Sequence, residues 1–198
     1  MSFGQVRFLS VLFEICLEKV PFGEIGMTTH LYLIRGLPGS GKTTLAHTLL
    51  DGLELGSCHF EADDWFEKED GYEFDPSQIK DAHSHCLERT KQALEEGKSV
   101  IVSNTFTQLW ELEPYVTIHT ESFYFPKGSK ASSDLKWRIS LTVIDLYDQG
   151  YGDIALSTKN RHGVPIEAIS RMRERYQHDW RSMGCSIRAN TRLVQGGN

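Results

Sequence analysis

The stretch HLYLIRGLPGSGKTT, residues 30–44, joins an apolar run to a loop rich in glycine. Residues 30–35 have the length and composition of a buried β-strand, and the residues after 41 continue in a helical pattern. The loop between them fits GxxxxGK[ST], a pattern that needs a strand before it and a helix after it. The fixed positions of that pattern are Gly36, Gly41, Lys42 and Thr43. The stretch therefore predicts a P-loop within an α/β fold.

A loop of this kind binds the phosphates of a nucleoside triphosphate. Its glycines let consecutive backbone N–H groups turn towards the phosphates, and the N-terminus of the following helix adds partial positive charge. We expect Lys42 to reach the β- and γ-phosphates and the Thr43 hydroxyl to ligate Mg²⁺. The sequence therefore predicts ATP, or a related triphosphate, and Mg²⁺ as ligands. The residues expected to line the nucleotide site are Gly36, Pro38, Gly39, Ser40, Gly41, Lys42, Thr43 and Thr44.

The rest of the chain alternates short apolar runs with helical patterns, which is typical of a parallel sheet flanked by helices. Asp75 before Pro76 is a suitable N-cap for the longest helix, and Gly97 a suitable stop. Further strands are expected at residues 57–61, 99–103, 139–146 and 185–188, and helices at 42–50, 76–96 and 164–180.

Length and charge limit the classes of function. The chain has 198 residues, 39% of them hydrophobic, which suits one α/β domain. The formal net charge is 21 − 27 = −6. That charge provides no general attraction for nucleic acid, so only a local basic patch could supply one.

Nothing in the sequence indicates export or a membrane span. No apolar stretch reaches the roughly 18 residues of a membrane-spanning helix. The first residues lack a small-residue cleavage site, and Glu14 and Glu18 interrupt their apolar run. The four cysteines are scattered without a CxxC pair and read as reduced thiols. We therefore expect a cytoplasmic protein.

Two acids follow the second expected strand, in HFEADDWF, residues 59–66. Ligands of an open parallel sheet bind beyond the carboxyl ends of its strands, where Asp63 and Asp64 are expected. An aspartate there can accept the proton of an attacking hydroxyl or help to hold Mg²⁺. We assign the catalytic role to Asp63 and a metal role to Asp64. The structural alternative is a helix N-cap, for which aspartate is a preferred residue.

The third expected strand ends in Ser103, Asn104 and Thr105. Hydrolytic P-loop enzymes often carry an aspartate at such a strand end, as a metal ligand. Asn104 cannot supply that charge, which weakens a motor-type ATPase and leaves Asp63 as the nearest acid. The alternative for Asn104 and Thr105 is ordinary loop capping.

A basic segment, STKNRHGVP at residues 157–165, precedes the last expected helix. A mobile lid over a triphosphate needs such residues, since arginine stabilises the charge of a transferring phosphoryl group. We expect Arg161 to act in catalysis and Lys159 to contact phosphate, with His162 beside them. The alternative is a solvated helix boundary.

Five segments occur in a recognisable order. They are HLYLIRGLPGSGKTTLA, ADDWF, YEFDPSQIKDAHSHC, VIVSNTFT and KNRHGVPIEAISRMRERY. Together they resemble the polynucleotide-kinase-like P-loop family, in particular the kinase-like modules of a ubiquitin-ligase-binding protein group and of cyclic-nucleotide phosphodiesterase. The resemblance covers roughly residues 28–180. It implies an adenylate-kinase-like parallel sheet, ATP with Mg²⁺, and transfer to a 5′-hydroxyl or a similar acceptor.

The resemblance also assigns individual positions. The family's catalytic aspartate falls on Asp63, its third-strand Asp-Thr on Asn104-Thr105, and its basic lid residues near Lys159 and Arg161. One position departs from the pattern, because Phe66 stands where phage polynucleotide kinase has an arginine that holds substrate phosphate. This departure predicts weak or no phosphorylation of plain oligonucleotides.

Residues 120–138 form an excursion between two strands that mixes aromatic and basic side chains. It is either a core-packing hairpin or a platform for single-stranded nucleic acid. We expect residues 27–198 to be a P-loop kinase domain that phosphorylates a polynucleotide 5′-hydroxyl, a modified base or a small molecule. Residues 1–26 are expected to be an N-terminal extension of unclear role. The alternatives are a non-catalytic nucleotide-binding adaptor and an ATPase.

Overall fold

The computed structural model describes residues 28–121, 138–179 and 188–190. Its centre is a five-stranded parallel sheet in the order β2-β5-β1-β6-β7. The strands are β1 (Thr28–Gly36), β2 (Cys58–Phe60), β5 (Val100–Ser103), β6 (Arg138–Tyr147) and β7 (Arg188–Asn190). This arrangement confirms the predicted parallel P-loop fold flanked by helices. The predicted extension 1–26 and most of the excursion 120–138 lie outside the described residues.

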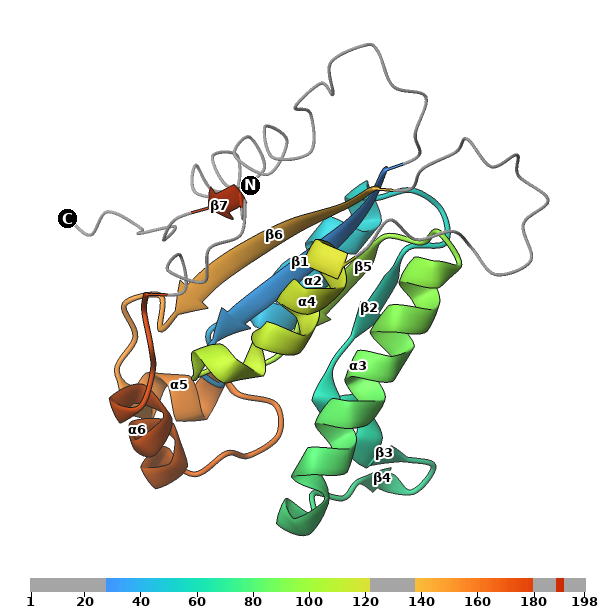
Figure 1. Ribbon diagram of the computed structural model, residues 1–198. Helices are drawn as coiled ribbons and strands as arrows, with labels where there is room; N and C mark the ends of the chain where they lie inside the picture. Colours follow the sequence, from blue (N-terminus) through green and yellow to red (C-terminus); the bar gives the residue numbers. More distant parts are fainter. Residues whose placement is uncertain (1–27, 122–137, 180–187, 191–198) are drawn as a thin grey trace, which may run out of the picture.

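Helices cover both faces of the sheet (Figure 1). One face carries α2 (Lys42–Gly52), and the other carries α3 (Ile79–Glu95) and α4 (Glu113–Glu121). Beyond the carboxyl ends of β1 and β6 lie α5 (Asp153–Lys159) and α6 (Ile166–Glu174). The smaller elements are η1 (Ala62–Phe66), β3 (Glu67–Lys68), β4 (Gly71–Tyr72), η2 (Pro76–Gln78) and η3 (Leu109–Glu111).

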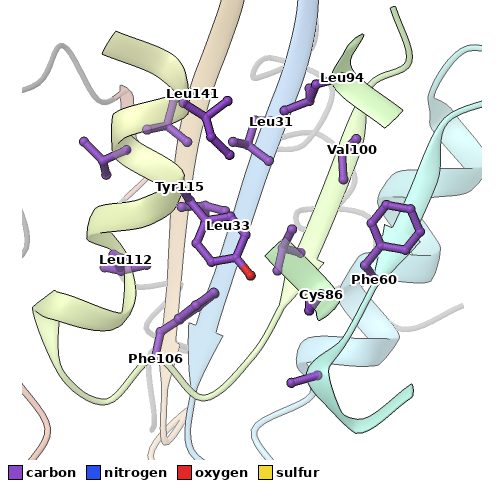
Figure 2. Close-up of a cluster of buried hydrophobic side chains, with 14 of the residues drawn as sticks. Leu31, Leu33, Phe60, Cys86, Leu94, Val100, Phe106, Leu112, Tyr115 and Leu141 are labelled. Atoms are coloured by element: carbon purple, nitrogen blue, oxygen red, sulfur yellow. The ribbon is translucent and has the colours of Figure 1, made fainter. Parts of the chain in front are cut away.

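The central strand β1 is buried on both faces because side chains alternate along a strand. Leu31 and Leu33 pack into the cluster that includes Cys86 of α3 and Tyr115 of α4, which Figure 2 shows. Tyr32 and Ile34, between and after them, pack against α2 on the opposite face. This two-sided burial explains the continuous apolar run, which is typical of strands in a parallel sheet. The same burial fixes the position of the loop that follows β1.

The structure refines the predicted helices. The helix expected at residues 76–96 begins as η2, where the Asp75 carboxylate accepts a hydrogen bond of 2.9 Å from the Ser77 N–H. The helix expected at residues 164–180 is shorter, since α6 begins after Pro165 and ends at Glu174. The helices α4 and α5 were not predicted. None of the described helices is both long and apolar enough to cross a membrane.

Candidate active site

The P-loop leaves a row of backbone donors open at the start of α2. Gly39 and Gly41 have φ values of +78° and +91°, a left-handed conformation that glycine adopts without steric cost. Gly41 is the N-cap residue of α2, and because glycine has no side chain it forms no capping hydrogen bond. The N–H groups of residues 41–44 make no hydrogen bond to any residue that the structure describes. Such consecutive free amides at a helix N-terminus form an anion-binding nest, which fits the phosphates of a nucleotide.

Lys42 lies in this loop with its ammonium group turned back on the backbone. Its Nζ donates a hydrogen bond of 3.0 Å to the Leu37 carbonyl oxygen. Burial lowers the pKa of Lys42 to about 8. The nearby carboxylates of Glu61 and Asp63 favour the charged form and partly oppose this shift. A bound phosphate would also favour the charged form. The protonation of Lys42 is therefore coupled to whatever anion occupies the nest.

Glu61, at the end of β2, is the residue that sequence reasoning missed. Thr43 Oγ1 donates a hydrogen bond of 2.7 Å to Glu61 Oε1, and Ser103 of β5 donates to the same oxygen. His59 Nε2 lies 2.8 Å from Ser103 Oγ and 3.5 Å from Glu61 Oε1. Burial alone would raise the pKa of Glu61, but hydrogen bonds from His59, Ser103 and Thr43 outweigh it and lower the pKa to about 2. An ionised carboxylate thus faces the predicted metal-binding hydroxyl.

Asp63 lies at the mouth of the same site, in η1. Its carboxylate accepts a hydrogen bond of 3.4 Å from the Tyr72 hydroxyl and lies 3.8 Å from His162 Nε2. Burial raises the pKa of Asp63, and the charge of Glu61 adds to that effect. His162, Lys42 and Tyr72 act in the opposite direction without cancelling it. The side chain remains 46% exposed, so a ligand in the cavity can reach it.

Asp64 has a different environment from its neighbour. Its Oδ2 accepts a hydrogen bond of 3.2 Å from the Glu61 N–H, which completes a capping box for η1. The same oxygen forms an ion pair of 2.8 Å with Arg89 of α3. These are the contacts of a helix cap, as the capping alternative describes, and the metal role of Asp64 stays a prediction.

The end of β5 serves the loop connections. Asn104 Oδ1 accepts a hydrogen bond of 2.8 Å from the Ala62 N–H, and its Nδ2 lies 3.7 Å from Cys86 Sγ. Through these contacts Asn104 fixes the start of η1 and hence the position of Asp63. The Thr105 carbonyl oxygen accepts a hydrogen bond of 3.2 Å from the Gly36 N–H, at the start of the P-loop. These contacts fit the capping alternative, and both residues also line the cavity described below.

The basic segment, residues 157–165, comprises the end of α5 and the connection to α6. We use the name lid for α5, this connection and the start of α6, which lie next to the P-loop. A Cβ added at Gly39 would lie 2.2 Å from the Leu156 carbonyl oxygen, so α5 packs directly on the loop. Asn160 Oδ1 accepts hydrogen bonds of 3.0 Å and 3.1 Å from the N–H groups of His162 and Val164, which order the connection. This ordering turns His162 towards Asp63.

One cavity of about 620 Å³ joins these parts. The predicted residues that line it are Pro38, Gly39, Gly41, Lys42, Thr43, Thr44, Asp63, Lys159 and Arg161. Lys159 Nζ lies 4.6 Å from the centre of the Tyr151 ring, while Arg161 is exposed. Gly36 and Ser40 do not line this cavity; a Cβ at Gly36 would meet Ser40 Oγ at 2.6 Å, so they pack against each other beneath the loop.

The fold and the site together define a nucleotide-binding P-loop protein with a kinase-like fold. The sequence profile of a family described as an AAA domain matches residues 31–123. The human protein NEDD4-binding protein 2 is 36% identical over 148 residues, which is 74% of this chain and 8% of that protein. This chain therefore corresponds to a small part of that relative.

Among solved structures, a chain of the Pnkp1/Rnl/Hen1 RNA repair complex superimposes with a TM-score of 0.55. It is 17% identical in sequence, and the match covers 83% of this chain and 48% of that chain. At this identity the likeness concerns the fold. With the relative above, it confirms the resemblance to the polynucleotide-kinase-like P-loop family.

Proposed function

We propose that this protein binds MgATP in the P-loop and transfers the γ-phosphoryl group to a hydroxyl acceptor. The observation that carries the proposal is the sharing of one cavity by the amide nest, the basic lid and Asp63. A module that only binds nucleotide has no need of a half-exposed aspartate of raised pKa in the same cavity as the nest. Such a group suits an incoming acceptor.

Each side chain then has a role in a balanced step. The acceptor oxygen forms a bond to the γ-phosphorus, the bond from that phosphorus to the β–γ bridging oxygen breaks, and ADP leaves. The acceptor proton passes to Asp63. Lys42, Lys159 and Arg161 offset the negative charge that develops on the phosphoryl oxygens.

Thr43 and Glu61 are the residues that would hold Mg²⁺, in place of the predicted pair Thr43 and Asp64. Both present oxygen atoms, the ligand type that Mg²⁺ prefers, and Mg²⁺ usually keeps several waters beside a few protein ligands. Glu61 is ionised and lies within hydrogen-bonding distance of Thr43. Mg²⁺ held by Thr43 and Glu61 would offset negative charge on the phosphates.

A second candidate is a nucleotide-binding module without catalysis. It is favoured by the description of the human relative as a binding protein and by Asn104, a neutral amide that supplies no charge to a metal. In both cases residues 27–198 would be the P-loop domain. We also propose that the protein is located in the cytoplasm.

A binding assay and a transfer assay separate these candidates. ATP with Mg²⁺ at about 100 times the dissociation constant should add roughly 2.7 kcal/mol of stability, and Lys42→Ala should remove most of it. Transfer of labelled γ-phosphate from ATP is then measured with nucleosides, oligonucleotides and small alcohols as acceptors. We expect acceptor-dependent ADP release and a labelled product. Binding without transfer to any acceptor favours the adaptor, and no binding at millimolar ATP contradicts both candidates.

A further inference from the structure

The cavity extends beyond Asp63 into a part that the phosphates do not need. One wall of this part comes from η1, the β3–β4 hairpin and α3, and the other from η3 and α6. Figure 1 shows α3 with the hairpin on one side of the molecule and α6 on the other. We call this part the acceptor half. Its lining residues are Phe66, Tyr72, Phe74, Ile79, Ala82, His83, Glu111, Ala168, Met172 and Arg175.

Aromatic rings make up the wall next to Asp63. Phe66 is buried and meets Tyr72 and Phe74 with ring centres 6.1 Å and 5.1 Å apart, both edge to face. The Tyr72 hydroxyl in turn donates a hydrogen bond to the Asp63 carboxylate. This bond connects the aromatic wall to the proposed proton acceptor. Phe74 lines the cavity yet is 53% exposed. An exposed ring at the edge of a cavity is a surface on which a flat ligand can stack.

A set of hydrogen-bonding groups lies along the same half. Burial lowers the pKa of His83, against the charges of Glu111 and Asp63, so its imidazole is neutral and offers one donor and one acceptor. No other described residue forms a hydrogen bond with its ring. Arg175 Nε donates a hydrogen bond of 3.2 Å to Thr107 Oγ1, and Thr107 Oγ1 donates one of 3.2 Å to Glu111 Oε2. The half thus presents imidazole, carboxylate and guanidinium groups beside an apolar wall, which suits the edge of a heterocycle.

The charges in the acceptor half disfavour an acceptor that carries phosphate. The cations Lys42, Lys159 and Arg161 belong to the P-loop and the lid. Among the described residues that line the acceptor half, Arg175 is the only cation, and the carboxylates of Glu111 and Asp63 offset it. Phosphate groups need cations that are not already balanced by acids. An uncharged ligand meets no such repulsion.

We propose that the acceptor half binds the base of an uncharged nucleoside, stacked on Phe74, with its sugar hydroxyl directed to Asp63. Transfer to that hydroxyl rests on the proposed kinase function, whereas binding of the base does not. The proposal narrows the acceptor to a monomeric nucleoside, in preference to the phosphorylated chain of an oligonucleotide.

The test is a calorimetric titration with uridine, adenosine and guanosine. It is run on the protein alone and on the protein saturated with Mg²⁺ and a non-hydrolysable ATP analogue, which fills any base site near the P-loop. We expect at least one nucleoside to bind in both conditions. Phe74→Ala should raise its dissociation constant by about fivefold or more, the lower end of base–aromatic stacking.

Trp110→Ala is the matched control, since Trp110 is an aromatic residue 63% exposed that does not line the cavity. It should leave nucleoside binding unchanged, and His83→Phe should change the preference among the three bases. Both Phe74 and Trp110 are exposed, so neither variant endangers folding. The proposal is overturned if no nucleoside binds, if Phe74→Ala and Trp110→Ala behave alike, or if only an oligonucleotide binds. Failure of the analogue to bind would instead contradict the proposed ATP site.

Discussion

Thr43 at the start of α2 and Glu61 at the end of β2, eighteen residues apart in the sequence, share a hydrogen bond of 2.7 Å. The bond connects the nucleotide loop to the sheet edge at which acids of P-loop proteins act on the metal. Because Ser103 and His59 also contact the Glu61 carboxylate, its orientation is fixed before any ligand arrives. If the Thr43 hydroxyl binds Mg²⁺ as proposed, a preorganised carboxylate next to it should raise the affinity for the metal.

Glu61→Gln removes the charge but keeps the size of the side chain. We expect the Mg²⁺ concentration for half-maximal ATP binding to rise by about 10- to 100-fold, the usual effect of losing a group that supports a metal site. Binding of ATP without metal should change little. Calorimetric titration with and without Mg²⁺ measures both quantities. Glu69→Gln, at an exposed position of the β3–β4 turn, is the control, and an equal loss in both variants would contradict the metal role of Glu61.

Lys42 makes ATP binding depend on pH. Its pKa is lowered from 10.5 to about 8 in the free protein, and phosphate binding raises it again. Below pH 8 the side chain is charged in both states, so affinity should be constant. Above pH 8 binding must take up a proton, so affinity should fall by up to about tenfold per pH unit.

Titrations of ATP between pH 6.5 and pH 9.5, about the range over which an amine of that pKa titrates, test this. Lys42→Arg is the matched variant, because a guanidinium stays charged throughout. Its affinity should show no decline above pH 8. A decline of the same size in Lys42→Arg would show that another group is responsible.

Gly39 should tolerate no side chain. It has φ of +78°, and a Cβ there would lie 2.2 Å from the Leu156 carbonyl oxygen in α5. Gly39→Ala therefore incurs a backbone cost of about 1–2 kcal/mol and also displaces the lid. Gly56→Ala is an ideal comparison, since φ is +94° there and the surrounding space is empty.

Chemical denaturation and ATP titration of both glycine variants separate the two costs. Gly56→Ala should lower the free energy of unfolding by the backbone cost alone and leave ATP binding intact. Gly39→Ala should lower it further and weaken ATP binding. Equal effects of the two changes on stability and on binding would mean that α5 does not pack on the loop as described.

The P-loop could be predicted from the sequence because its signals are local. The apolar run, the glycines and the helical pattern occupy consecutive residues, and each predicts the same element. Glu61 could not be recognised in this way. Its role depends on Thr43 and Ser103, which the pairing of β2 with β5 and the packing of α2 bring to one carboxylate oxygen. Sequence spacing does not reveal that convergence.

The two neighbouring aspartates show the same limit. Asp63 and Asp64 are chemically identical in the sequence, and either could serve a metal, a proton or a helix cap. The tight turn of η1 sends one carboxylate towards Tyr72 and His162 and the other towards Arg89. The short helices α4 and α5 were missed for a related reason, since nine and seven residues carry too little periodicity to stand out.

Asp63 and Asp64 therefore provide the sharpest test of the proposed transfer step. Asp63→Asn keeps the shape of the side chain and removes its ability to accept a proton. We expect turnover with the true acceptor to fall by about 10²- to 10⁴-fold, the usual contribution of a general base, while ATP affinity stays within a few-fold. Because burial raises the pKa of Asp63, turnover in the parent protein should fall with decreasing pH at a higher pH than for an ordinary carboxyl.

Asp64→Asn should lower stability, through loss of the Arg89 ion pair, and leave turnover near that of the parent. Single-turnover transfer and ATP titration on both variants measure these effects. If Asp63→Asn abolishes ATP binding, Asp63 belongs to the metal site, and if Asp64→Asn lowers turnover equally, the metal role first predicted for Asp64 returns.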